Sequence, residues 1–245
     1  MMIHFGNGKR RGGQRGFTLI ELAVVVTIIG ILAMMAVPDL SDQTLERRTY
    51  DDAGQILGLV RTARTRAMGR GAATMLLLDT INSNHLRGNY QLFEAVAPDP
   101  GQGLNATARV PNSSCTVPAN GWTASNPTNT FIDSVDLNGT YETQINVTSR
   151  IVVFDNTGTP TVTGNVIALC FTPLGRTYFW QGGAGSTPQF TAAAPFLGTI
   201  AVDVARLFQG QTAINATSTA GLTRRVIIPS SGNARMVSTL TPPAP

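Results

Sequence analysis

Residues 16–38 read GFTLIELAVVVTIIGILAMMAVP, and the rest of the chain is organised around them. Between Phe17 and Val37 the only ionisable group is Glu21, close to the start of the stretch. An α-helix rises about 1.5 Å per residue, so a helix of this length roughly matches the hydrocarbon core of a bilayer, which is about 30 Å thick. The stretch therefore predicts one membrane-spanning helix over residues 17–38.

The segment before this helix is basic. Residues 1–16 contain no acid and four cations, namely Lys9, Arg10, Arg11 and Arg15. Positively charged flanks are retained on the cytoplasmic side of a membrane. We therefore expect residues 1–16 to stay in the cytoplasm.

Glu21 is unusual, because a carboxylate inside lipid costs several kcal/mol unless a cation neutralises it. A free α-amine at a newly cut N-terminus would provide that cation. Cleavage between Gly16 and Phe17 would place such an amine about one helical turn from Glu21. The expected partner of Glu21 is therefore the amine of Phe17, of the same chain or of a neighbouring subunit.

The heptapeptide over residues 16–22, on its basic leader, resembles the prepilin leader and N-terminal helix of type IV pilins and type II secretion pseudopilins. The resemblance implies cleavage between Gly16 and Phe17 by a membrane prepilin peptidase, N-methylation of Phe17, and packing of the helix with other pilin or pseudopilin subunits in a filament core. The alternative is an ordinary signal anchor or secretory signal. A secretory signal has an apolar region of about 7–15 residues and is cleaved after it, whereas this stretch is longer and follows the break.

Three later segments resemble the GspH/FimT branch of minor pilins and pseudopilins. They are Val60–Leu78, Ala168–Thr177 and Arg224–Met236, which are similar to the helix end with the first strand, a later strand, and the closing hairpin of that branch. The resemblance implies a minor, non-enzymatic subunit for type II secretion or type IV pilus assembly. It also implies a bacterial, single-pass inner-membrane protein whose C-terminal domain is periplasmic.

The sequence thus divides into a leader over residues 1–16, a transmembrane and filament-core helix over 17–38, and a pilin-like domain over 39–245. Within this domain, the polar excursion over 98–147 has no counterpart in the resemblance.

The pattern after Pro38 predicts an α+β domain. A second, amphipathic helical half is expected over residues 39–70, with Pro38 bending or interrupting the helix and Gly71 ending it. One stripe of this half recurs at helical spacing and is expected to be buried: Ala53, Ile56, Leu57, Val60, Ala63 and Ala67. Its arginines, among them Arg47, Arg61, Arg64 and Arg70, are expected to form a solvated face.

Short apolar runs after residue 72 predict strands that form an antiparallel sheet against the helix. The expected strands are Ala73–Asp79, Tyr90–Ala97, Thr143–Thr148, Arg150–Asp155, Asn165–Phe171, Arg176–Trp180, Thr199–Val204, Arg224–Ile228 and Ala234–Leu240.

Charge gives no general sign of nucleic-acid binding. The chain has 18 Lys and Arg against 14 Asp and Glu, and loss of the leader leaves equal numbers. Residues 204–245 nevertheless carry arginines and no acid, so Arg224, Arg225 and Arg235 are candidate contacts to DNA phosphates in a minor pilin for DNA uptake. DNA-binding members on the FimT side carry a Gly-Arg-x-Arg-like tail. Residues 232–235 read GNAR, without the first arginine.

The two cysteines fit a periplasmic domain, where disulfides persist. Cys115 and Cys170 are expected to form one, and separately buried thiols are the alternative. Two cysteines with His85 do not make a structural zinc site, so no metal is expected.

The sequence carries no nucleophile, phosphate-binding or dinucleotide motif, so we expect neither catalysis nor a cofactor. Asp133, Asp136 and Asp155 lie in or near expected strands. A carboxylate pair for hydrolysis requires a defined separation, and solvated acids at strand ends are the expected explanation.

Overall fold

The computed structural model describes residues 17–80, 87–98, 109–116, 122, 129–137, 147–155, 157–163, 166–190, 195–208, 211, 214 and 217–240. The chain forms two compact units, Met1–Thr44 and Leu45–Pro245. Each is described here by itself.

Helix α1 (Leu19–Arg70) begins in the first unit, directly after Thr18, and its residues from Leu45 onward belong to the second unit. The amide of Glu21 donates to the Thr18 side-chain Oγ1 at 3.3 Å and to its carbonyl at 3.1 Å, so Thr18 caps the helix. Pro38 does not interrupt the helix, and that part of the prediction is wrong. Among the described residues, no helix has an apolar stretch of the length that crossing a membrane requires.

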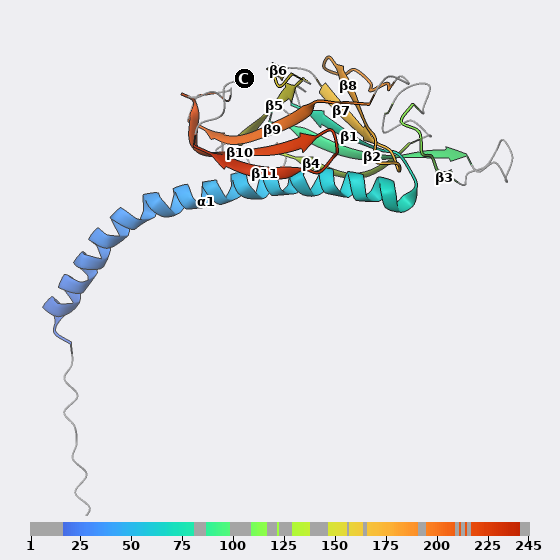
Figure 1. Ribbon diagram of the computed structural model, residues 1–245. Coiled ribbons are helices and arrows are strands. Elements are labelled where there is room, and N and C mark those ends of the chain that lie inside the picture. Colours follow the sequence, from blue (N-terminus) through green and yellow to red (C-terminus); the bar gives the residue numbers. More distant parts are fainter. Residues whose placement is uncertain are drawn as a thin grey trace, which may run out of the picture. The chain divides into compact units, whose positions relative to one another are not determined.

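The second unit combines the later part of α1 with two antiparallel sheets (Figure 1). The first sheet has the order β3-β2-β1-β7-β8, and β4 also pairs with β2. Its strands are β1 (Thr74–Asp79), β2 (Asn89–Pro98), β3 (Arg109–Pro111), β4 (Asn129–Asp136), β7 (Val166–Phe171) and β8 (Thr177–Gly182). The second sheet has the order β11-β10-β9-β5-β6. Its strands are β5 (Val147–Phe154), β6 (Pro160–Thr163), β9 (Thr199–Leu207), β10 (Thr219–Pro229) and β11 (Arg235–Thr239).

The main core lies where α1 meets both sheets. The predicted helical stripe is confirmed, since Ala53, Ile56, Val60, Ala63 and Ala67 are fully buried in this core and Leu57 packs at its edge. Alternate residues of the strands complete it, such as Leu76 and Leu78 of β1 and Val202 and Val204 of β9. The predicted α+β class with a helix on antiparallel strands is therefore correct. The structure divides the strands between two sheets, where the sequence indicated one.

The end of α1 is held by Gly71, as predicted. Gly71 adopts a left-handed φ of 68°, which ends the helix and turns the chain into β1. Just beyond it, the hydroxyl of the buried Thr74 donates to the carbonyl of Ala63 at 2.6 Å. Ala63 lies about two turns before the end of α1. This bond fixes the start of the first sheet to the helix.

Three strands differ from the prediction. β4 and β3 lie inside the stretch interpreted as an irregular excursion, and β6 was not predicted. β4 reads NTFIDSVD and is largely exposed beside β2, so it lacks the continuous apolar character that marks a buried strand. One strand, β5, contains residues from both of the runs predicted at 143–148 and 150–155, and residues 143–146 of the first run lie outside the described part.

The hairpin between β10 and β11 depends on Gly232, which has a φ of 73°. A Cβ at this position would lie 2.9 Å from Phe171 Cε1 and 3.1 Å from Arg64 Cδ. Gly175 has a similar φ of 77°, but a Cβ there would meet no atom within 4 Å. An alanine at Gly175 would therefore meet only the cost of the left-handed backbone, whereas an alanine at Gly232 would meet this cost and the steric clash.

We predict that Gly175→Ala lowers the free energy of unfolding by about 1–2 kcal/mol, from the left-handed backbone alone. Gly232→Ala should lower it by about 1–3 kcal/mol more, because the hairpin must move away from α1 and β7. Urea unfolding of the two variants measures the difference. Equal losses would show that the hairpin is not packed closely at Gly232.

Candidate functional site

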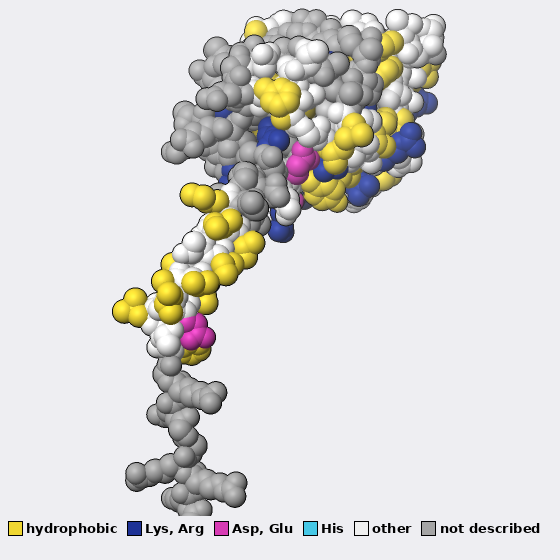
Figure 2. Space-filling model, turned by 90° about the vertical axis from the view of Figure 1, so that its left-hand side faces the viewer, with side chains coloured by type: hydrophobic (Ala, Val, Ile, Leu, Met, Phe, Trp, Pro, Cys, Tyr) yellow, Lys and Arg dark blue, Asp and Glu magenta, His cyan; other side chains and the backbone are white. Residues whose placement is uncertain are grey.

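The N-terminal unit exposes an apolar helix with one acid in its first turn (Figure 2). Large side chains from Leu19 to Met34 are mostly more than half exposed, with Leu19 at 87% and Met34 at 83%. A contiguous apolar surface of this kind requires a covering of lipid or protein. Phe17 is 84% exposed directly before the helix, whereas Gly16 lies outside the described residues.

Glu21 has a second local role that the sequence prediction missed. Thr18 and Glu21 have the spacing of a capping box, in which the N-cap Thr is followed three residues later by Glu or Gln. An acid in the first turn also interacts favourably with the helix dipole. The TLIE pattern of residues 18–21 is the signal that would have indicated this role.

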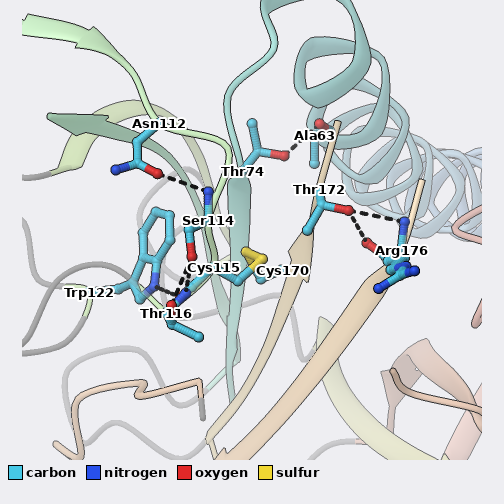
Figure 3. Close-up of a disulfide and its surroundings, with 10 residues drawn as sticks. All are labelled: Ala63, Thr74, Asn112, Ser114, Cys115, Thr116, Trp122, Cys170, Thr172 and Arg176. Atoms are coloured by element: carbon cyan, nitrogen blue, oxygen red, sulfur yellow. Dashed lines mark hydrogen bonds between the residues drawn. A yellow bond between two sulfur atoms is a disulfide. The ribbon is translucent and has the colours of Figure 1, made fainter. Parts of the chain in front are cut away.

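Cys115 and Cys170 form a disulfide, with their Cα atoms 6.0 Å apart (Figure 3). Cys170 is fully buried in β7, and Cys115 follows β3. Trp122 lies beside the bridge and donates its indole N–H to the carbonyl of Cys115 at 3.1 Å. Together with Phe190 and Met75, these residues form a second apolar cluster on the side of the first sheet that faces away from the main core. The bridge thus fastens part of the 98–147 segment to the sheet.

We predict that Cys115→Ser with Cys170→Ser lowers the free energy of unfolding by about 4 kcal/mol, the chain-entropy value for the 55-residue separation of the two cysteines. Thermal unfolding of the oxidised protein and of the double variant measures this. Non-reducing peptide mapping of periplasmic material should recover the cross-linked pair. Two free thiols in that material would contradict the prediction.

Two of the three arginines proposed for DNA contact are engaged inside the domain. Arg225 is buried, and its Nε and Nη2 donate to the two carboxylate oxygens of Asp203 at 2.5 and 2.8 Å. Arg224 lies 3.6 Å from the Glu46 carboxylate, and its guanidinium stands 5.6 Å from the centre of the Tyr50 ring. Both side chains thus already have carboxylate partners inside the domain, and their contact with DNA phosphates stays a prediction. Arg235 is exposed.

Asp203 joins three strands of the second sheet. Arg150 of β5 lies directly opposite it in register and donates to its carboxylate at 2.9 Å, while Arg225 of β10 lies opposite on the other side. Both arginine side chains are largely buried. Breaking such a pair by removing one partner typically costs about 3–5 kcal/mol, so this row is a structural element of the sheet.

The three candidate carboxylates are divided between the two sheets. Asp133 and Asp136 belong to β4 in the first sheet, whereas Asp155 follows β5 in the second. Asp155 accepts hydrogen bonds from the hydroxyl of Thr157 and the amide of Thr159, which lower its pKa and organise the turn. His85 lies outside the described residues, and the described part of the chain contains no cluster of three or more metal-ligating side chains.

Asp52 is an acid on α1 whose protonation responds to mild pH. It is half-buried on α1, and burial raises its pKa from 3.8 to about 6, with a further increase from Asp51 and an opposing effect of Arg48. The folded protein therefore retains a proton on Asp52 at pH values where the unfolded chain has lost it. Its contribution to stability is present below pH 4 and is lost as the pH rises from about 4 to 6.

We predict that Asp52→Asn removes this part of the decline in stability between pH 4 and pH 6. The variant should unfold at a higher urea concentration than the parent chain at pH 7 and at a similar concentration near pH 4. Asp51→Asn removes the neighbouring charge that adds to this rise in the pKa of Asp52, so it should flatten the pH profile only in part, because burial remains. A parent-like slope in Asp52→Asn would contradict the assignment.

The described part of the chain begins with an exposed apolar helix that is capped by Thr18 and has Glu21 in its first turn. A domain of antiparallel strands follows, and this order is the organisation of a pilin-like subunit. Comparison with known proteins agrees with this class. Residues 11–37 match the prokaryotic N-terminal methylation motif. No solved structure matches the chain.

Several curated proteins are similar to parts of the chain. The type IV major fimbrial protein FimA of Dichelobacter nodosus is 37% identical over 98 residues, which cover 38% of this chain and 62% of that protein. A fimbrial protein of Pseudomonas aeruginosa is 43% identical over 58 residues, 24% of this chain and 37% of that protein. The type II secretion system core protein G of Klebsiella michiganensis is 61% identical over 31 residues, 13% of this chain and 22% of that protein.

The chain is therefore type IV pilin-like, with the N-terminal methylation motif and with relatives among fimbrial and type II secretion proteins. It spans less than two thirds of the length of each of these relatives. Their names include major fimbrial proteins and do not distinguish a major from a minor subunit here.

Proposed function

We propose that the chain is a minor pilin or pseudopilin of the GspH/FimT type, a structural subunit of an inner-membrane-based filament for type II secretion or type IV pilus assembly. The observation that carries this proposal is the exposed apolar helix with Glu21 in its first turn, whose N-terminal part lies within the residues, 11–37, that match the methylation motif. A prepilin peptidase would cut between Gly16 and Phe17. The helix would then anchor the subunit in the membrane before it enters the filament.

In this proposal, Glu21 neutralises the α-amine of Phe17 on an incoming subunit. The helix around Glu21 offers no other charged side chain, since residues 17–37 contain no second ionisable group. Once the helix is surrounded by lipid or by other apolar helices, an unpaired amine and an unpaired carboxylate are both costly. Pairing the two across subunits removes both costs at the same time and fixes the axial position of one helix against the next.

DNA capture is the less favoured alternative. Arg224 and Arg225 are held by Glu46 and Asp203, so Arg235 alone of the three proposed contacts is exposed. Non-specific binding to DNA depends on many simultaneous phosphate contacts. One exposed arginine on β11 does not provide such a row.

We predict that Glu21→Gln is inserted and cleaved normally but enters filaments poorly. Gln preserves both the shape and the capping-box geometry, so the variant removes only the charge. Loss of one partner of a buried ion pair typically costs about 3–5 kcal/mol. Co-purification of the tagged subunit with filament partners measures incorporation, and N-terminal sequencing should still begin at Phe17.

Glu21→Asp, which keeps the charge, is the matched control and should retain more incorporation than Glu21→Gln. In the same preparations, a minor subunit should be present well below the amount of the principal filament subunit. Incorporation of Glu21→Gln at the parent level would refute the pairing. A chain as abundant as the principal subunit would instead make this protein a major pilin.

A further inference from the structure

A groove runs between the last turns of α1 and the tip of the β10–β11 hairpin. It has a volume of about 320 Å³ and is lined by Arg61, Arg64, Thr65 and Met68 of the helix and by residues 232–234 of the hairpin. Every lining residue belongs to the second unit. Arg61 is exposed, in agreement with the solvated face expected of this helix, whereas Arg64 is half-buried where it borders the hairpin.

The charge of this groove is uncompensated. Its only charged side chains are Arg61 and Arg64, and no acid is among the residues that line it. Other arginines of the same helix have carboxylate partners, since Arg66 and Arg70 lie 2.5 and 2.9 Å from the Glu94 carboxylate. In the described part of the chain, no ion pair is formed by Arg61 or Arg64.

The two guanidinium groups are held in place by neutral acceptors of the hairpin. Arg61 Nη2 donates to the carbonyl of Ala234 at 3.4 Å, and Arg64 Nη1 donates to the side-chain oxygen of Asn233. Arg64 Nε is shielded from solvent and has no acceptor among the described residues. A guanidinium carries several N–H donors, and each of these two arginines gives one of them to the hairpin, so donors remain for an anion in the groove.

The groove also has an apolar wall. Met68 is 47% exposed, although it is a large hydrophobic side chain on the face of α1 that borders the two arginines. A ligand that fits this arrangement carries an acidic group beside an apolar one. A guanidinium binds a carboxylate through paired hydrogen bonds, and a methionine side chain adapts to many apolar shapes.

We propose that this groove is a docking site for an acidic peptide segment of another polypeptide, with a carboxylate on Arg61 and Arg64 and an adjacent apolar side chain on Met68. The volume suits a few side chains, near the lower end of ligand-site sizes, and the lining contains no aromatic ring on which a base could stack. These features favour a peptide over a nucleic acid. The site does not use Glu21 or the apolar helix, so it stands or falls independently of the filament proposal.

The test measures fluorescence anisotropy with the full-length chain in detergent micelles. The probe is a fluorescein-labelled hexapeptide of alternating glutamate and leucine, and the control probe has glutamine in place of glutamate. We expect saturable binding of the glutamate peptide and at least about tenfold weaker binding of the glutamine peptide, which corresponds to about 1.4 kcal/mol.

Two variants test the groove itself. Arg64→Gln removes one cation, and Met68→Glu adds an acid while leaving the contacts of both arginines with the hairpin in place. Each should weaken binding about tenfold or more. Arg47→Gln, on the same helix with a side chain that is 85% exposed, is the matched control and should bind as the parent does. Near-ultraviolet circular dichroism verifies that each variant is folded. If Arg64→Gln loosens the hairpin, the effect of Met68→Glu on peptide binding tests the groove.

Failure of the glutamate peptide to bind, or parent-like binding by Met68→Glu, would overturn the proposal. A short single-stranded oligonucleotide serves as the competing probe. If the oligonucleotide binds more tightly than the peptide and loses binding in the same variants, the groove is a nucleic-acid site and the peptide assignment is wrong.

Discussion

The packing of one face of α1 against two sheets is the interaction on which the second unit depends. The central residues of that face are small or of medium size, and Ala53, Ala63 and Ala67 leave room for the strands to approach the helix closely. Each sheet contributes its alternate apolar residues to the same core, so the burial of the apolar face of each sheet depends on the helix. Full burial of a large aliphatic side chain contributes about 1.5–3 kcal/mol, and Ile56 and Val60 do so at the centre of this contact.

Ion pairs hold the helix against the sheets at the two ends of the part of α1 that belongs to the second unit. Near Leu45, the Glu46 carboxylate accepts the amide of Leu222 at 2.9 Å and pairs with Arg224, which ties it to β10 of the second sheet. Near the C-terminal end of the helix, Arg66 and Arg70 bind the buried Glu94 of β2 in the first sheet. Burial of the apolar stripe stabilises the contact but is not directional. The ion pairs have defined geometry, so they favour one position of the helix along the sheets. The β10 strand is irregular between Ala220 and Arg224, and Gly221 with a φ of 77° accommodates Glu46 there.

The two units of the chain differ in how they treat apolar surface: the first exposes it and the second buries it in a core. The apolar helix of the first unit leaves its large side chains exposed, which is unfavourable for an isolated molecule and suits a subunit that is covered on assembly. The second unit carries the disulfide, the paired charges and the groove beside the β10–β11 hairpin. Between β3 and β4, the described residues Cys115 and Trp122 pack against the first sheet.

The amino-acid sequence by itself determined the pilin-like class, the start and the end of the helix, and most strands, although it wrongly indicated an interruption at Pro38. These features depend on local patterns: the apolar stretch after a basic leader, the buried stripe of α1, the stop at Gly71 and the alternation of residues in strands such as β1 and β7. It did not reveal β4, because an exposed strand beside β2 lacks an apolar pattern. Nor did the sequence distinguish the buried arginines from the exposed ones. Arg225 and Arg235 lie close together in sequence on neighbouring strands, yet one is buried against Asp203 and the other is exposed. Only the tertiary structure decides this, since the environment of a charge depends on strand register and on partners that are distant in sequence. The groove at Arg61 and Arg64 exists for the same reason, because a hairpin about 170 residues further along the chain forms its other wall.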